Sequence, residues 1–162
     1  MTNRNFLGID VGTTTVKAGV INQAGQIIAQ FSRAYPTSRT GANLVEQNPD
    51  DWVDLINQAM AAFAGHEIAA IGLTSQVNTH VFVGADKAAL MPAIVWQDGR
   101  ASVEAAALDA KVSVAQKLAW WGAPMPIDAS HACARMAWVA AHRPEVWDKT
   151  RYVMLPKDYC LL

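Results

Sequence analysis

The sequence predicts a layered α/β domain that opens with a β-meander. Three strand patterns follow one another without room for a helix, at Phe6–Asp10, Thr15–Ile21 and Gln26–Arg33. Beyond them, strand patterns alternate with helical patterns, which is typical of a sheet whose strands are joined by crossover helices. The length of 162 residues suits one domain.

The meander is the best punctuated part of the chain. Phe6–Asp10 is an apolar run without a polar face, which predicts a buried strand. Thr15–Ile21 alternates in polarity, and the turn residues Asn22–Gly25 join it to the third strand. A polar loop is expected over Thr37–Asn48.

A helix is expected directly after Asn48. Asn48 is a good N-cap, Pro49 suits the first helical position, and Asp50 and Asp51 favour the positive end of the helix dipole. Apolar residues recur at helical spacing and predict one buried stripe: Trp52, Leu55, Ile56, Ala59, Met60 and Phe63.

The remaining elements follow in βα order. The expected strands are Ile68–Thr74, buried on both faces, then His80–Val83, Ala93–Trp96 and Tyr152–Leu155. The expected helices are Ser102–Trp121, broken near Ser113, and Ser130–His142. Pro156 starts a helix that reaches Leu162 without a cap, so we expect the chain to continue in a larger protein.

Composition limits the function classes. Hydrophobic residues make up 52% of the chain and charged residues 17%, which supports a packed core. A net charge of -1 gives no electrostatic attraction for nucleic acid or an anionic membrane. No apolar run approaches the roughly 20 residues that span a bilayer, and the polar N-terminus does not resemble a signal peptide. We expect a cytoplasmic protein.

The turn between the first two strands carries the chemistry. Gly12 lets the backbone approach a ligand, successive amides can bind an anion, and hydroxyls and a cation add to this. Asp10 would repel phosphate but can hold Mg²⁺ through water. The predicted site for a metal-bound nucleotide comprises Asp10, Gly12, Thr13, Thr14, Thr15 and Lys17. It is neither a Walker loop nor a dinucleotide fingerprint, and an ordinary hairpin is the alternative.

Five segments, in this order, resemble the FGGY family of carbohydrate kinases, and the last two most resemble xylulokinases. They are GIDVGTTTVKAGV, VEQNPDDW, IGLTSQ, AIVWQDGR and LPKDY. The resemblance covers nearly the whole chain but only the first part of the family's N-terminal domain. It implies an actin-like, ribonuclease H-like ATPase fold, incomplete here, with the rest of that domain and the C-terminal domain absent.

The resemblance also assigns roles. ATP and Mg²⁺ would be the cofactors, with Asp10 facing the metal. The sugar would be bound by Gln76, Val77, Asn78, Trp96 and Asp98. Trp96 would stack on the sugar, Asp98 would accept its hydroxyls, and Arg100 would brace the loop. Glu46 and Gln47 either pin a loop or touch the sugar.

The resemblance implies ATP-dependent phosphorylation of a ketopentose such as D-xylulose. Xylulose-specific relatives tend to carry Gln-Met-His where this chain has Gln76-Val77-Asn78, so another sugar or polyol is an alternative. No segment matches the family's catalytic aspartate, so these residues alone are predicted to be inactive. A non-catalytic sugar- or nucleotide-sensing module and a chaperone-like ATPase are the other readings. The oligomeric state stays open, a homodimer included.

Overall fold

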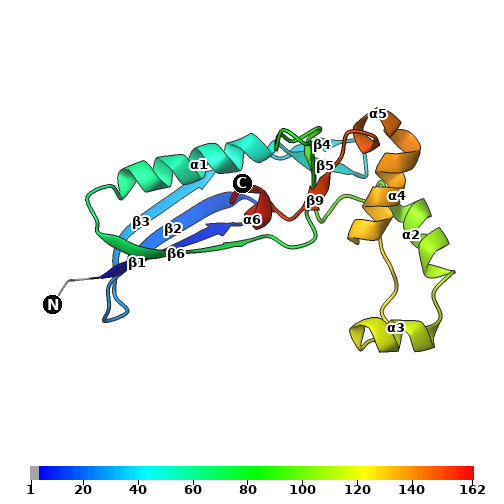
Figure 1. The fold of residues 1–162 in the computed structure, drawn as a ribbon, viewed down its shortest axis with the longest axis horizontal. Helices are drawn as coiled ribbons and strands as arrows, with labels where there is room; N and C mark the ends of the chain where they lie inside the picture. Colours follow the sequence, from blue (N-terminus) through cyan, green and yellow to red (C-terminus); the bar gives the residue numbers. More distant parts are fainter. Residues whose placement is uncertain (1–3) are drawn as a thin grey trace. The chain divides into compact units, whose positions relative to one another are not determined.

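The computed structural model describes residues 4–162, which form two compact units (Figure 1). The first unit comprises residues 4–37, 48–77 and 154–162. The second comprises residues 38–47 and 78–153. The predicted phosphate-binding turn belongs to the first unit, and the Trp96 loop belongs to the second.

A four-stranded sheet in the order β3-β2-β1-β6 forms the centre of the first unit. Its strands are β1 (Asn5–Val11), β2 (Thr15–Ile21), β3 (Ile27–Ala34) and β6 (Ile68–Ser75). The first three are antiparallel neighbours, and β6 lies parallel to β1. The predicted meander, followed by a crossover to a later strand, is confirmed.

Helix α1 (Pro49–Ala62) runs along one face of this sheet (Figure 1). It begins where the sequence predicts, because the Asn48 side chain accepts a hydrogen bond of 3.2 Å from the backbone N–H of Asp50. Trp52 and Ala59 are fully buried in its stripe, whereas Met60 is 38% exposed. The stripe is therefore confirmed except at its edge.

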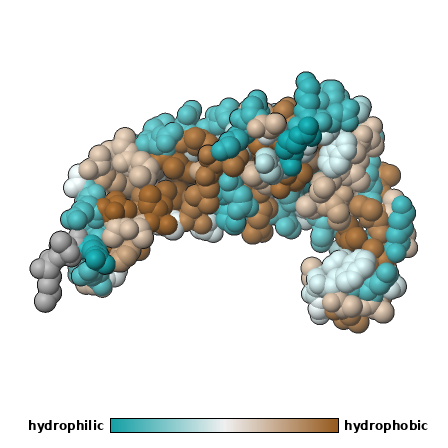
Figure 2. Space-filling view, in the orientation of Figure 1, coloured by the Kyte–Doolittle hydropathy of each residue, from teal (hydrophilic) through white to brown (hydrophobic). Residues whose placement is uncertain are grey.

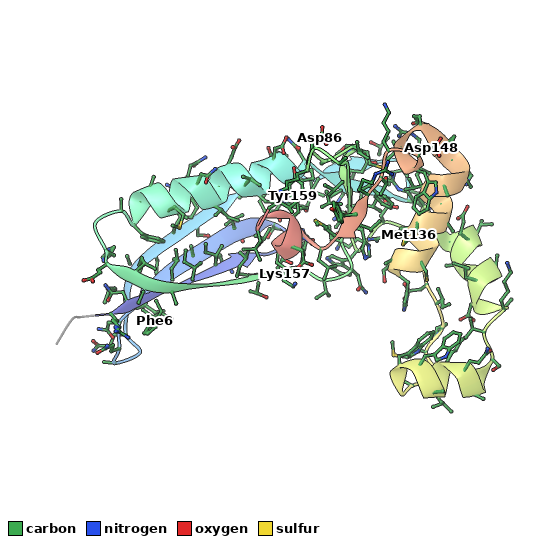
Figure 3. All side chains as sticks on the ribbon, in the orientation of Figure 1. Phe6, Asp86, Met136, Asp148, Lys157 and Tyr159 are labelled. Atoms are coloured by element: carbon green, nitrogen blue, oxygen red, sulfur yellow. The ribbon has the colours of Figure 1, made fainter. Side chains whose placement is uncertain are left out.

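The opposite face of the sheet is exposed in the described residues. Burial alternates along β1, and side chains on the open face include Phe6 (43% exposed) and Ile71 (52% exposed). Figure 2 shows hydrophobic surface over β6, and Figure 3 labels Phe6 at the strand end. The prediction that the first strand and Ile68–Thr74 are fully buried is wrong, because an apolar run does not reveal whether both faces are covered.

The short helix α6 (Pro156–Tyr159) starts at the predicted proline and fastens two elements of the first unit. The backbone N–H of Lys157 donates to Ser75 Oγ at 3.1 Å, and the Tyr159 hydroxyl donates to Asp50 Oδ1 at 3.1 Å. Both side chains are labelled in Figure 3. The helix thus links the end of β6 to the start of α1.

The second unit contains short strands. β4 (Ser38–Thr40), β5 (Leu44–Gln47) and β8 (Ala93–Ile94) form one sheet, and β7 (Val81–Val83) pairs with β9 (Tyr152–Met154). The prediction of a loop over Thr37–Asn48 is wrong, since β4 and β5 form a hairpin there. Gly41 takes a φ of 64° at its turn. Strands of three and four residues carry too little periodicity to be recognised.

Four helices complete the second unit: α2 (Ser102–Asp109), α3 (Val114–Trp121), α4 (Ala132–His142) and α5 (Pro144–Trp147). The break predicted near Ser113 is confirmed, because Ser113 and Gln116 form a capping box at the start of α3. Phe82, Ile94 and Val139 are fully buried in a core against which Met136 packs (Figure 3). Within residues 4–162, no helix is both long and apolar enough to cross a bilayer.

Candidate functional site

The turn between β1 and β2 is tight. The backbone N–H of Gly12 donates to the Thr15 carbonyl at 3.0 Å. A β-carbon on Gly12 would lie 3.2 Å from that carbonyl oxygen and 3.5 Å from Asp10 Oδ2. Glycine therefore keeps the backbone open to a ligand beside the Asp10 carboxylate.

Asp10 and Lys17 face each other across the two strands, and Thr74 of β6 is the other neighbour of Asp10. Their side chains border a hollow of about 550 Å³ on the open face of the sheet. The structure thus places a carboxylate, a cation and a hydroxyl beside the turn that carries Thr13 and Thr14. This arrangement suits a ligand with anionic oxygens and a bound cation.

The donor set fits magnesium. Among residues 4–162, no three His, Cys, Asp or Glu side chains gather as a metal cage. Mg²⁺ is commonly held by one or two carboxylates, with water and substrate phosphates as its remaining ligands. Asp10, beside a turn that a glycine keeps open, meets that requirement without further protein ligands.

Gln76 is tied to the turn through Tyr35, a residue that sequence reasoning missed. The backbone N–H of Gln76 donates to the Val11 carbonyl at 2.8 Å, and its Nε2 donates to the Tyr35 hydroxyl at 3.4 Å. That hydroxyl donates in turn to the Gly12 carbonyl. Burial raises the pKa of Tyr35, so its phenol stays a neutral donor. The neighbouring Val77 is 69% exposed.

Asn78 and Trp96 belong to the second unit. Asn78 has a φ of 52° and is exposed, and its Nδ2 donates to Ser130 Oγ at 3.2 Å. Trp96 is 45% exposed, and its backbone N–H donates to Thr79 Oγ1 at 3.1 Å. One bond thus fixes the Trp96 backbone to the segment that carries Asn78, while part of the indole surface stays accessible.

Asp98 is buried, and both oxygens of its carboxylate accept hydrogen bonds from the protein. Its Oδ2 accepts from the backbone N–H of Val45 at 2.6 Å, and its side chain has no exposed surface. Both carboxylate oxygens also accept from the Arg100 guanidinium at 2.8 Å. Arg100 braces this loop as expected. The family resemblance implies that Asp98 accepts sugar hydroxyls, but in the structure its carboxylate accepts hydrogen bonds from Val45 and Arg100.

Glu46 completes the Arg100 cluster. It accepts from Arg100 Nη2 at 2.8 Å. Burial opposes the charge on Arg100, but hydrogen bonds and charge attraction from Asp98 and Glu46 raise its pKa overall. Of the two roles open for Glu46, the structure shows the loop contact.

Arg135 is the functional candidate that sequence reasoning missed most completely. It is fully buried on α4 and donates to the carbonyls of Asn78, Ile94 and Val95, the last two at 2.8 and 2.6 Å. Among the described residues it forms no ion pair. The sequence indicates Arg135 only by placing a charged residue on the apolar face of α4, where the structure buries it.

His80 lies 3.0 Å from the Arg135 guanidinium through its Nδ1. Burial lowers its pKa to about 4, and the charges of Arg135 and His131 add to this effect. The pKa of His80 is lower in the folded state than in the unfolded state, so the unfolded state takes up the proton first as pH falls. Neutral His80 therefore makes stability depend on pH. The contribution is complete above the unfolded pKa and is lost as pH falls through the folded pKa.

We therefore expect the free energy of unfolding to fall by about 2 kcal/mol between pH 7 and pH 4.5 through His80 alone. Urea unfolding at several pH values measures this in the wild type and in His80→Gln. The variant should have the shallower pH dependence over that interval. Equal slopes in the two proteins would show that His80 does not carry the effect.

Comparison with known proteins places the chain in a family. Residues 5–162 match the model of the N-terminal domain of the FGGY family of carbohydrate kinases. The chain is 30% identical to the xylulose kinase of Escherichia coli K12, over 97% of this chain and 32% of that protein. It is 31% identical to the xylulose kinase of Bacillus subtilis 168, over 94% of this chain and 31% of that protein.

Solved structures agree. A xyloylose kinase from Brucella ovis superposes with a TM-score of 0.88 and 31% identity, over 98% of this chain and 34% of that one. The xylulose kinase from Rhodospirillum rubrum superposes with a TM-score of 0.90 and 26% identity, over 98% of this chain and 34% of that one. The predicted actin-like fold is confirmed, and the chain spans about a third of these relatives' length. The chain belongs to the FGGY family of carbohydrate kinases, with residues 5–162 matching the N-terminal domain.

Proposed function

We propose that the protein containing this chain transfers the terminal phosphate of ATP to a hydroxyl of a ketopentose, with D-xylulose as the leading substrate. One observation carries this proposal: the β1–β2 turn, opened by Gly12, lies beside Asp10 and is tied through Tyr35 to Gln76. Relatives named xylulose kinases, at about 30% identity, support the choice of sugar.

The turn would bind the cofactor. Backbone N–H groups from Gly12 onward and the threonine hydroxyls of Thr13, Thr14 and Thr15 would donate to phosphate oxygens, and Lys17 would add a positive charge. Asp10 would hold Mg²⁺, which neutralises the charge that develops on the transferred phosphate. These residues bind and orient, and positioning supplies most of the catalysis in phosphoryl transfer.

The sugar would be bound from the other segments. Trp96 offers an accessible indole surface for the apolar face of a sugar, and the exposed Asn78 offers its side-chain amide to a hydroxyl. Gln76 is buried and donates to Tyr35, so we propose that it acts by holding the β1–β2 turn. The exposed Val77 would add an apolar contact. We propose that Asp98 acts on the sugar through the Trp96 loop, because its carboxylate already accepts four hydrogen bonds from Val45 and Arg100.

A general base must take the proton from the attacking hydroxyl. We propose that it comes from outside these 162 residues, because none of them matches the family's catalytic aspartate. The isolated 162-residue chain is accordingly expected to show no sugar-dependent ATP turnover. The lack of a matching aspartate in these 162 residues also motivates a competing proposal, a non-catalytic sensing module.

A kinase for another sugar or polyol is the second candidate, and Asn78 motivates it. A panel of D-xylulose, other ketopentoses, aldopentoses and polyols, assayed by ADP release with the natural protein, separates the two. We expect the highest kcat/KM for D-xylulose. A polyol or another sugar with a higher kcat/KM would replace the substrate, and phosphorylation of any of them would exclude the sensing module.

A further inference from the structure

The side-chain amide of Asn78 has a fixed polarity. An asparagine amide has a donor end and an acceptor end, so a bond made by one end decides what the other can offer a ligand. Nδ2 of Asn78 donates to Ser130 Oγ at 3.2 Å. Oδ1 is left as the acceptor of an exposed residue.

Asp128 fixes the direction of that bond. Ser130 Oγ donates its single hydrogen to Asp128 Oδ1 at 2.7 Å, and the backbone N–H of Ser130 donates to the same oxygen at 2.7 Å. The hydrogen bond from Ser130 lowers the pKa of Asp128, which keeps the carboxylate ionised and acceptor-only. With its hydrogen committed, Ser130 Oγ can only accept from Asn78.

The backbone beneath Asn78 is also held. The carbonyl of Asn78 accepts from the fully buried Arg135, whose guanidinium also binds the carbonyls of Ile94 and Val95 at 2.8 and 2.6 Å. Asn78 itself takes a left-handed φ of 52°. Hydrogen bonds therefore fix both the backbone conformation and the side-chain amide orientation of Asn78.

We propose that Asp128 and Ser130 are positioning residues that fix the Asn78 amide so that its Oδ1 accepts a hydrogen bond from a substrate hydroxyl. This inference rests on the proposed sugar kinase function. It defines a specificity: the group facing Asn78 must donate, so a hydroxyl is bound and an acceptor-only group such as fluorine is rejected. Without Ser130 the amide is free to rotate and present its donor end instead.

Calorimetry on the natural protein tests whether Asp128 and Ser130 position Asn78, with D-xylulose and its monodeoxyfluoro analogues as ligands. We expect at least one fluoro analogue to bind the wild type about five- to tenfold more weakly than D-xylulose. In Ser130→Ala and Asp128→Ala that ratio should fall toward one. KM for D-xylulose should rise about fivefold while kcat stays within about twofold.

Ser113→Ala is the matched control, since it removes a serine hydroxyl that caps α3 and should leave the ratio unchanged. Ser130→Ala should add nothing to Asn78→Ala, because the serine acts through the asparagine. Unchanged discrimination in Ser130→Ala, with D-xylulose still bound, contradicts this inference alone. A wild-type protein that fails to bind D-xylulose contradicts the proposed substrate and this inference together.

Discussion

Asp10→Asn is expected to lower kcat of the natural protein by about two to three orders of magnitude. The substitution keeps the shape of the side chain but removes the charge beside the turn that Gly12 opens. Mg²⁺ would then lose its one carboxylate ligand in this part of the chain. Steady-state kinetics with varied Mg²⁺ measure the effect, and the apparent Mg²⁺ affinity should weaken together with kcat.

Asp54→Asn is the control, because Asp54 is an exposed carboxylate on α1. It should leave kcat and the Mg²⁺ dependence unchanged. If Asp10→Asn retains wild-type activity, Asp10 neither holds the metal nor takes part in transfer. If it loses activity at an unchanged Mg²⁺ affinity, Asp10 acts on the substrate and not through the metal.

Arg100→Met is expected to lower the free energy of unfolding by about 3–5 kcal/mol. The Asp98 side chain has no exposed surface and that of Arg100 only 5%, so the substitution leaves a buried carboxylate without its counter-charge. Chemical unfolding measures the loss. Adding Asp98→Asn should recover part of it, since the second change removes the stranded charge.

Arg143→Met provides the comparison. Arg143 and Glu145 pair at 2.6 Å with side chains 45% and 61% exposed, and such surface pairs contribute under about 1 kcal/mol. Equal losses in Arg100→Met and Arg143→Met would contradict a buried brace at Asp98. Conversely, if Asp98→Asn raised KM for the sugar without changing stability, Asp98 would contact the sugar directly.

The sequence predicts the elements whose signals are local. Asn48 and Pro49 start α1 and Pro156 starts α6, through a cap or a backbone restriction set by neighbouring residues. The predicted break near Ser113 is also local, because Ser113 caps α3 there. The β1–β2 turn is equally local, since Asp10 to Lys17 lie on two strands joined by three residues. Such features can be predicted because no distant partner decides them.

What the sequence does not predict depends on distant partners. Tyr35 reaches Gly12 and Gln76, and Arg135 reaches Asn78, 57 residues away along the chain. Asp98 looks like a free acceptor until Val45, 53 residues away, is found beside it. The exposure of one face of β1 is also not predicted, because an apolar run does not show whether another element covers it.

We propose that the β1–β2 turn serves phosphate transfer to a sugar. The stoichiometry of products from the natural protein supplied with ATP, Mg²⁺ and D-xylulose tests this proposal. We predict one sugar monophosphate for each ADP, with the rates of both falling together by about two to three orders of magnitude in Asp10→Asn. ADP without sugar phosphate would indicate an ATPase, and neither product from any sugar of the panel would contradict the claim.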